Sequence, residues 1–151
     1  MMQWLKALKI FYFKLKQWRN RVMTQEDKQL LFKDLCARLP YGIKVQYDSQ
    51  TCKLVTTNDD YTVLLLGEDG YVPNIEDGLF LDIEKVKPYL RSMDDMTDDE
   101  KKEYFGRTLN IGIVKTSRVI IDWFLEHHFD FRNLIEKGLA IEITEENNPY
   151  K

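Results

Sequence analysis

The chain is poor in cysteine, proline and glycine, and it has no long apolar run. Its 151 residues include two Cys, four Pro and seven Gly. These counts exclude a disulfide scaffold, a zinc site built from cysteines alone and a Pro/Gly-rich low-complexity chain. The longest aromatic run of residues 1–22 is Ile10-Phe11-Tyr12-Phe13, far short of the roughly 20 apolar residues of a transmembrane helix.

Short catalytic and nucleotide-binding motifs are also missing. The sequence has no Gly-x-Gly-x-x-Gly, no Walker A loop, no Gly-x-Ser-x-Gly and no Cys-x-x-Cys. The tetrapeptide Gly67-Glu68-Asp69-Gly70 is predicted to be a turn, because its two carboxylates would repel a phosphate. We therefore expect a protein that is not an enzyme and that carries no cofactor and no metal ion.

Charge is distributed unevenly along the chain. Residues 1–22 hold six of the 22 bases and no acid, whereas residues 23–151, called the body below, hold 16 bases and all 25 acids. The body therefore has a formal charge of −9, which disfavours direct binding to nucleic acid because phosphates require a basic surface. The basic segment suits an anionic membrane surface, an acidic protein partner or the acidic body of its own chain.

Residues 1–22 are predicted to form a basic amphipathic helix. At about 100° per residue one stripe collects six apolar residues, namely Trp4, Leu8, Phe11, Leu15, Trp18 and Val22. An interfacial membrane helix has this pattern, and so does a helix that packs on its own domain or on a second copy, which is the commoner case in soluble chains. The residues predicted to bind a partner or a membrane are Trp4, Lys6, Lys9, Phe11, Lys14, Lys16, Trp18, Arg19 and Arg21.

This segment is not expected to be a signal peptide, because its bases are interleaved throughout and no small-residue cleavage site follows. We expect a protein of the bacterial cytoplasm, peripheral to a membrane if the helix binds lipid, with both thiols reduced. Met23 is a candidate alternative start, and the sequence does not decide between it and Met1.

The first half of the body is predicted to be a helix followed by short strands. Thr24 is a candidate N-cap and Pro40 ends the helix. The spacing of apolar residues then changes from helical to alternating. Strands are expected at 43–47, 52–57, 61–66 and 79–83, with a tight turn and a closing segment at 84–90. Strands this short and close predict a small, curved antiparallel sheet, an SH3-like barrel.

The second half is predicted to be mainly helical. Thr97 and Glu100 form a capping box for a helix that ends near Gly106. A second helix is expected over 117–128, a short helix over 130–138 and a strand over 139–143. The predicted fold class is α+β, with N-terminal helices, the curved sheet and a helical C-terminal section. Residues 1–22 form the basic helix, 23–145 a single domain and 146–151 a frayed tail.

Two other functions are compatible with parts of the sequence. A small hydrolase would use His127 or His128 with Asp130 and Cys36, although adjacent histidines on a helix point about 100° apart and fit structural roles. An acidic inhibitor that mimics nucleic acid would use the carboxylates of 94–100, although the capping box explains most of that run. The acids concerned are Asp94, Asp95, Asp98, Asp99 and Glu100.

Three long stretches carry a resemblance to a known family: Lys33-Asp34-Leu35-Cys36-Ala37-Arg38-Leu39-Pro40-Tyr41-Gly42, Val86-Lys87-Pro88-Tyr89-Leu90-Arg91-Ser92-Met93, and residues 127–140 from His127 to Ala140. Over about residues 23–145 the chain resembles small uncharacterised proteins of gut anaerobic bacteria and of their phages and mobile elements. The resemblance implies no activity. It implies a phage or mobile-element setting, in which small proteins bind host or virion components.

The sequence therefore predicts a non-enzymatic binding or accessory protein of a phage or mobile element. It is expected to act through protein–protein contacts or self-association, with the basic helix as an anchor to a partner or to an anionic membrane surface.

Overall fold

The computed structural model describes residues 2–19, 23–73, 78–109 and 113–151, and leaves out the side chains of 13–19, 109 and 113–117. The first helix, α1 (Met2–Arg19), lies apart from the body, and α2 (Gln25–Arg38) packs on a sheet. Two more helices, α3 (Asp98–Leu109) and α4 (Ile113–Glu126), form a hairpin beside it. Helices and a single sheet in one body confirm the α+β class.

Helix α2 begins and ends where the sequence predicts. The Thr24 hydroxyl accepts a hydrogen bond from the Asp27 backbone amide at 3.1 Å, which satisfies one of the free donors of the first turn. After Arg38 the chain tightens into a 3₁₀ turn, Leu39–Tyr41, that contains Pro40. Gly42 follows at φ +69°, a left-handed conformation that glycine adopts without strain.

Six strands form the sheet: β1 (Lys44–Tyr47), β2 (Gln50–Asn58), β3 (Thr62–Gly67), β4 (Leu81–Asp82), β5 (Val86–Leu90) and β6 (Ile141–Glu142). Their order across the sheet is β4-β3-β2-β1-β5-β6, and every pair is antiparallel except β5–β6. Asp48 and Ser49, both at positive φ, make the two-residue turn between β1 and β2. The four predicted strand regions are therefore found.

The sheet is open, so the predicted SH3-like barrel is not formed. Strands β4 and β6 lie at opposite edges, and each is only two residues long. The residues that would close a barrel instead make a parallel pair, in which Tyr89 and Leu90 lie opposite Ile141 and Glu142. A parallel pair between segments about 50 residues apart leaves no local pattern that sequence reasoning can detect.

One hydrophobic core lies between α2 and the sheet. Leu31 and Leu35 of α2 are fully buried against strand residues such as Val45, Leu54 and Leu65. These positions follow helical spacing on one element and alternation on the other, as binary patterning requires. The core is complete within the body, and no residue of α1 belongs to it among the residues that the structure describes.

A second, smaller core is aromatic and belongs to the α3–α4 hairpin. Trp123, Phe124 and Phe129 are buried together, with Tyr104 packed against them. The Trp123 and Phe129 rings stack with centroids 5.6 Å apart, an arrangement that adds to the energy of burial. The hairpin is thus held by a few large rings and not by an extended apolar face.

The ends of the hairpin helices differ from the prediction. Helix α3 continues past Gly106 to Leu109, and the ion pair between Arg107 and Glu103 at 2.9 Å spans that turn. Glycine in a helix costs only about 1 kcal/mol relative to alanine, so one glycine does not end a helix. The second predicted helix, over 117–128, starts earlier, at Ile113, and ends at Glu126.

The C-terminal section is less helical and better packed than predicted. Residues 130–138 form turns, because the Asp130 carboxylate accepts hydrogen bonds from the amides of Leu134 and Ile135 at 2.9 Å, and Asn133 is left-handed. The tail of 146–151 is not frayed at its end. The Tyr150 hydroxyl accepts from the Lys44 amide at 2.9 Å and donates to the Tyr89 carbonyl at 3.2 Å, which ties the tail to the sheet.

Candidate functional site

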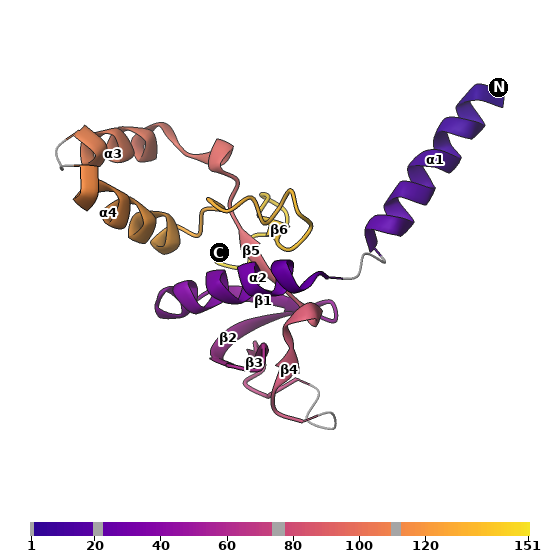
Figure 1. Cartoon of the computed structure of the whole chain (residues 1–151), viewed down its shortest axis with the longest axis horizontal. Helices are drawn as coiled ribbons and strands as arrows, with labels where there is room; N and C mark the ends of the chain where they lie inside the picture. Colours follow the sequence, from indigo (N-terminus) through magenta and orange to yellow (C-terminus); the bar gives the residue numbers. More distant parts are fainter. Residues whose placement is uncertain (1, 20–22, 74–77, 110–112) are drawn as a thin grey trace.

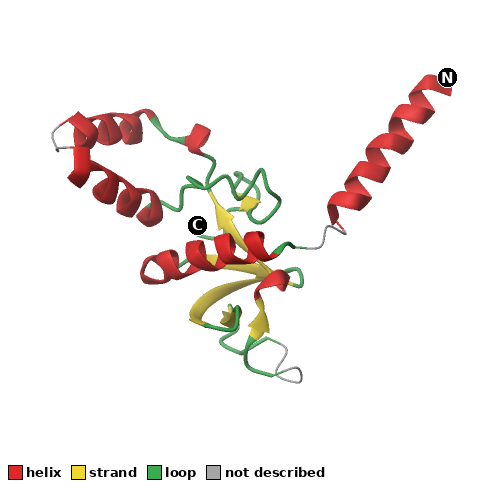
Figure 2. Ribbon diagram, in the orientation of Figure 1, coloured by secondary structure: helices red, strands yellow, loops and turns green. Residues whose placement is uncertain are grey.

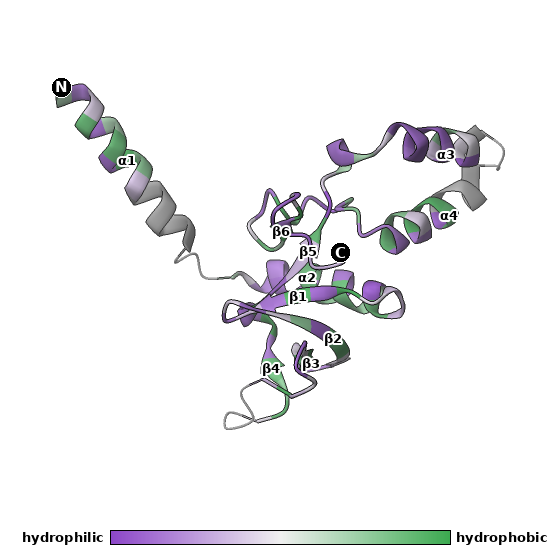
Figure 3. Ribbon diagram, turned by 180° about the vertical axis from the view of Figure 1, so that it is seen from behind, coloured by the Kyte–Doolittle hydropathy of each residue, from purple (hydrophilic) through white to green (hydrophobic). Residues whose placement is uncertain are grey.

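Helix α1 exposes its whole described surface. Every side chain from Met2 to Tyr12 is exposed, and the exposed fractions of Trp4, Phe11 and Tyr12 are 69%, 63% and 70%. Figure 3 shows apolar and polar residues interleaved along this helix. Large aromatic residues usually lose most of their exposed surface on folding, so α1 carries apolar surface that the fold does not use.

The basic side chains of α1 are also unengaged where the structure describes them. Lys6 and Lys9 are exposed, and neither forms an ion pair or a hydrogen bond with another described residue. The helical backbone includes Lys14, Lys16, Trp18 and Arg19, whose side chains lie outside the description, and Arg21 lies outside the described residues altogether. The structure thus places four of the nine predicted binding residues, Trp4, Lys6, Lys9 and Phe11, on an open surface.

The four residues of the hydrolase hypothesis each have a different environment. The Cys36 thiol lies 3.3 Å from the Thr57 hydroxyl, and Nδ1 of His127 lies 2.9 Å from the Trp123 carbonyl. Asp130 uses both carboxylate oxygens on backbone amides. No hydrogen bond joins an imidazole to Asp130 or Cys36 in the described parts of the chain, so these side chains do not form a nucleophile–base pair there.

His128 is the more perturbed of the two histidines. Its ring stacks on Tyr150 at a centroid distance of 4.0 Å, and its backbone is left-handed at φ +62°. Burial, followed by the charges of Arg38, Arg91 and His127, lowers the pKa of His128 to about 4. The imidazole is therefore neutral near pH 7, and its stacked position suits a structural role at the base of the tail.

The acidic run of 94–100 mainly caps α3. The Glu100 carboxylate accepts from the Thr97 amide at 3.0 Å, and the Thr97 hydroxyl accepts from the Glu100 amide at 3.1 Å, which confirms the predicted capping box. Glu100 also accepts two hydrogen bonds from the Arg91 guanidinium, at 2.6 and 2.8 Å. The Arg91 contact is the main reason why the pKa of Glu100 falls to about 2. At least this carboxylate is not available as a phosphate mimic.

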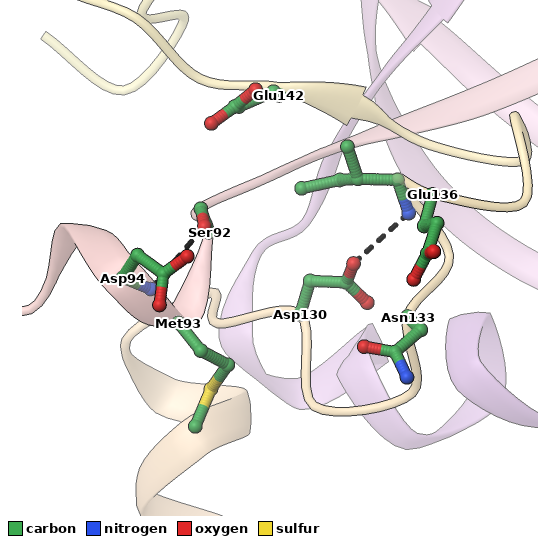
Figure 4. A pocket seen from close by; sticks show the side chains of 8 residues that line it. Ser92, Met93, Asp94, Asp130, Asn133, Glu136 and Glu142 are labelled. Carbon is green, nitrogen blue, oxygen red and sulfur yellow. Dashed lines mark hydrogen bonds between the residues drawn. The ribbon is translucent and has the colours of Figure 1, made fainter.

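Two pockets on the body are lined in part by residues 91–97. One, of about 330 Å³, has Asp94, Asp130, Glu136 and Glu142 among its lining residues, and Figure 4 draws their side chains. The other, of about 460 Å³, is lined by His127, His128 and Tyr150 among others. Among the described residues no group of three or more His, Cys, Asp or Glu side chains is arranged to hold a metal ion.

A buried charged junction, which sequence reasoning missed, joins the two cores. Asp34 and Arg38 are both fully buried, and Nε of Arg38 lies 2.7 Å from Oδ2 of Asp34. The guanidinium of Arg132 donates to Oδ1 of Asp34 at 2.5 Å. Arg38 also donates to the Phe129 carbonyl at 2.7 Å, linking α2 to the aromatic core. The spacing of Asp34 and Arg38, four residues apart on a helix, was the only available signal.

No helix among the described residues is both long and apolar enough to cross a bilayer. No family model, curated protein or solved structure matches the chain. The geometry of the described residues favours α1 as the candidate functional element. This helix presents exposed aromatic and basic side chains, whereas Asp34, Arg38, Arg91, Glu100 and Asp130 of the body bind one another or the backbone.

Proposed function

We propose that this chain is a non-enzymatic binding protein that acts through protein–protein contacts, with α1 as the anchor to its partner or to a membrane. The observation that carries the proposal is the exposure of every described side chain of α1 beside a body that already has its own closed core. Apolar patches that a fold leaves exposed commonly mark a surface that binds something else.

The contrast in charge supports the same proposal. Residues 1–22 carry six bases and no acid, and the body carries a formal charge of −9. A basic helix joined to an acidic body can attach to an anionic surface while the body is held away from it. Direct nucleic-acid binding by the body is disfavoured on the same ground.

The setting of the protein belongs to the proposal as well. We place it in the cytoplasm of a bacterial host, as an accessory protein of a phage or mobile element that is peripheral to its attachment surface. Its two thiols, Cys36 and Cys52, are unpaired, which suits a reducing compartment.

The experiment compares the full chain with residues 23–151. Both are tagged, their unfolding is measured in urea, and their distribution is followed between the membrane and soluble fractions of a bacterial lysate. We expect the free energy of unfolding to be equal within about 0.5 kcal/mol, because none of the described side chains of α1 (residues 2–12) is buried. We expect residues 23–151 to lose the membrane or partner association that the full chain shows.

Two results would contradict the proposal. If residues 23–151 fail to fold, α1 is part of the core and not an anchor. If residues 23–151 retain all association of the full chain, the binding surface lies on the body and α1 has another use. A full-length variant in which Phe105, an exposed ring of the body, is changed to Ser serves as the matched control, because it removes exposed apolar surface without touching α1.

A further inference from the structure

We infer that α1 binds the surface of an anionic lipid membrane, with its apolar stripe toward the acyl chains and its lysines toward the phosphates. This inference rests on the proposed function, since it names what the anchor holds. The rival occupants of the helix are the chain's own body, a second copy and another protein.

The chain's own body is the least favoured occupant. A helix tethered by a few residues meets its own body at an effective concentration in the millimolar range, and the opposite charges of the two parts favour contact. Even so, Trp4, Phe11 and Tyr12 stay more than half exposed. The described side chains of α1 therefore stay exposed although the body also exposes apolar residues, such as Tyr71 and Phe105.

A second copy is disfavoured by the same observation and by charge. The body of a second copy presents the same surface as the body of the same chain, which α1 does not bind. The second copy also presents it at a lower effective concentration. Pairing of two α1 helices would bring five bases against five, with no acid on either side. Like charges at such close range are destabilising, so α1 is not built to pair with itself.

An anionic membrane suits each feature of the helix. At 18 residues, α1 is about 27 Å long, long enough to lie across several lipid headgroups. Its stripe begins with Trp4, Leu8 and Phe11 and is widened by Leu5 and Tyr12, a broad aromatic face typical of interfacial helices. Lysine and tyrosine side chains can reach the headgroups while their apolar portions stay in the interface.

The linker between α1 and α2 limits how far the body can lie from a membrane that α1 binds. Five residues separate Arg19 from Gln25, and they can span at most about 17 Å. Met23 packs against the hydrophobic core and Thr24 caps α2, so the body begins at Met23. A membrane-bound α1 therefore holds the N-terminal end of α2 close to the lipid surface, while the acidic body is repelled from it.

The test uses the full chain and two kinds of vesicle, one of phosphatidylcholine and one of phosphatidylcholine mixed with phosphatidylglycerol. Binding is measured by co-sedimentation, and the oligomeric state by sedimentation velocity without lipid. We expect a monomer that binds the anionic vesicles much more tightly than the neutral ones. Binding should weaken steeply toward about 1 M salt, where the Debye length falls to about 3 Å.

Matched variants separate charge from apolar contact. Each base near an anionic surface is worth about 1 kcal/mol, so Lys6→Gln/Lys9→Gln should weaken binding to anionic vesicles roughly 30-fold. The control is Lys101→Gln/Lys102→Gln, which removes two exposed charges from α3 and should leave vesicle binding unchanged. Trp4→Ser/Phe11→Ser should reduce vesicle binding at every salt concentration, whereas Phe105→Ser on the body should not.

The outcomes distinguish the inference from the proposed function. If the full chain binds neither vesicle but still loses lysate association on deletion of residues 1–22, the inference is wrong and the anchor holds a protein. If the full chain forms an α1-dependent dimer in place of binding vesicles, the occupant is a second copy. If residues 23–151 bind the anionic vesicles as tightly as the full chain, both the inference and the assignment of the anchor to α1 are overturned.

Discussion

Trp4 and Trp123 lie on two amphipathic helices of the same chain, yet their exposed fractions are 69% and 2%. Around Trp123 the rings of Phe124, Phe129 and Tyr104 close a small aromatic core. Trp4 belongs to neither core of the described residues, and its helix lies apart from the body (Figure 1). An apolar stripe therefore predicts a helix, but it does not predict whether other elements bury that stripe. Burial depends on which elements the fold places next to the helix.

The same contrast holds for charge. The described lysines of α1 are exposed and unpaired, whereas Asp34 and Arg38 of α2 are fully buried and paired with each other. In the body, charged groups stabilise the junction between two cores. On α1 they remain available for a surface outside the chain. Matched substitutions in the two regions should therefore change the free energy of unfolding by different amounts.

The largest difference is expected between the two tryptophans. Trp123→Ala should lower the free energy of unfolding by about 3–5 kcal/mol, because it leaves a cavity among buried rings. Trp4→Ala should change it by less than about 0.5 kcal/mol, because the indole is already in solvent. Urea unfolding of the two variants measures both values. Equal losses would show that α1 packs on the body and would remove the basis of the comparison.

A loss of about 3 kcal/mol is expected for Asp34→Ala. The substitution leaves the fully buried Arg38 and the half-buried Arg132 without their shared carboxylate, and breaking a buried ion pair costs about 3–5 kcal/mol. Lys9→Ala on α1 is the matched control and should be neutral. Equilibrium unfolding in urea gives both values. A neutral result for Asp34→Ala would mean that water replaces the carboxylate and that the junction does not join the two cores.

The elements that depend on local signals could be predicted from the sequence. The caps at Thr24 and Thr97, the end of α2 before Pro40 and the alternation of β1 to β3 are properties of neighbouring residues, and local chemistry decides them. Residues 130–138 were predicted as a helix for the same reason. Their apolar spacing is helical, but the Asp130 carboxylate and left-handed Asn133 favour turns.

The features that depend on distant residues could not be predicted. The open sheet follows from a pairing between β5 and β6, and the junction joins Asp34 to Arg132 across 98 residues. A single sequence contains no record of such contacts, because any of several strands or bases could fill each role. For the candidate site, the composition of α1 could be read from the sequence, whereas the exposure of residues 2–12 is known only from the structure.

The dependence of stability on pH should belong to the body alone. Burial lowers the pKa of His128 from its ordinary value of 6.5 to about 4, so its neutral form stabilises the fold fully above pH 6.5. That contribution should be lost as the pH falls toward 4. The pKa of Glu100 is about 2 against 4.5, so its charged form stabilises the fold above pH 4.5 and is lost toward pH 2.

Two variants and one deletion test these pH windows by urea unfolding at a series of pH values. His128→Asn should flatten the upper window, since asparagine tolerates the left-handed backbone, and Glu100→Gln should flatten the lower one. Each window is expected to be worth about 1–2 kcal/mol after screening by solvent. Residues 23–151 should follow the profile of the full chain. A different profile would place a titrating contact between α1 and the body.

The smallest effect is expected at the two ends of the chain, where two tyrosines give a matched pair. The Tyr150 hydroxyl links the Lys44 amide to the Tyr89 carbonyl, and burial raises the pKa of Tyr150 to about 12. Tyr150→Phe leaves that amide without its acceptor and should cost about 1 kcal/mol in urea unfolding. Tyr12→Phe on α1 should cost nothing, because Tyr12 is 70% exposed. If Tyr150→Phe is also neutral, the tail is frayed after all. The exposure of α1 would then match that of the other chain end, and would no longer set α1 apart as a binding element.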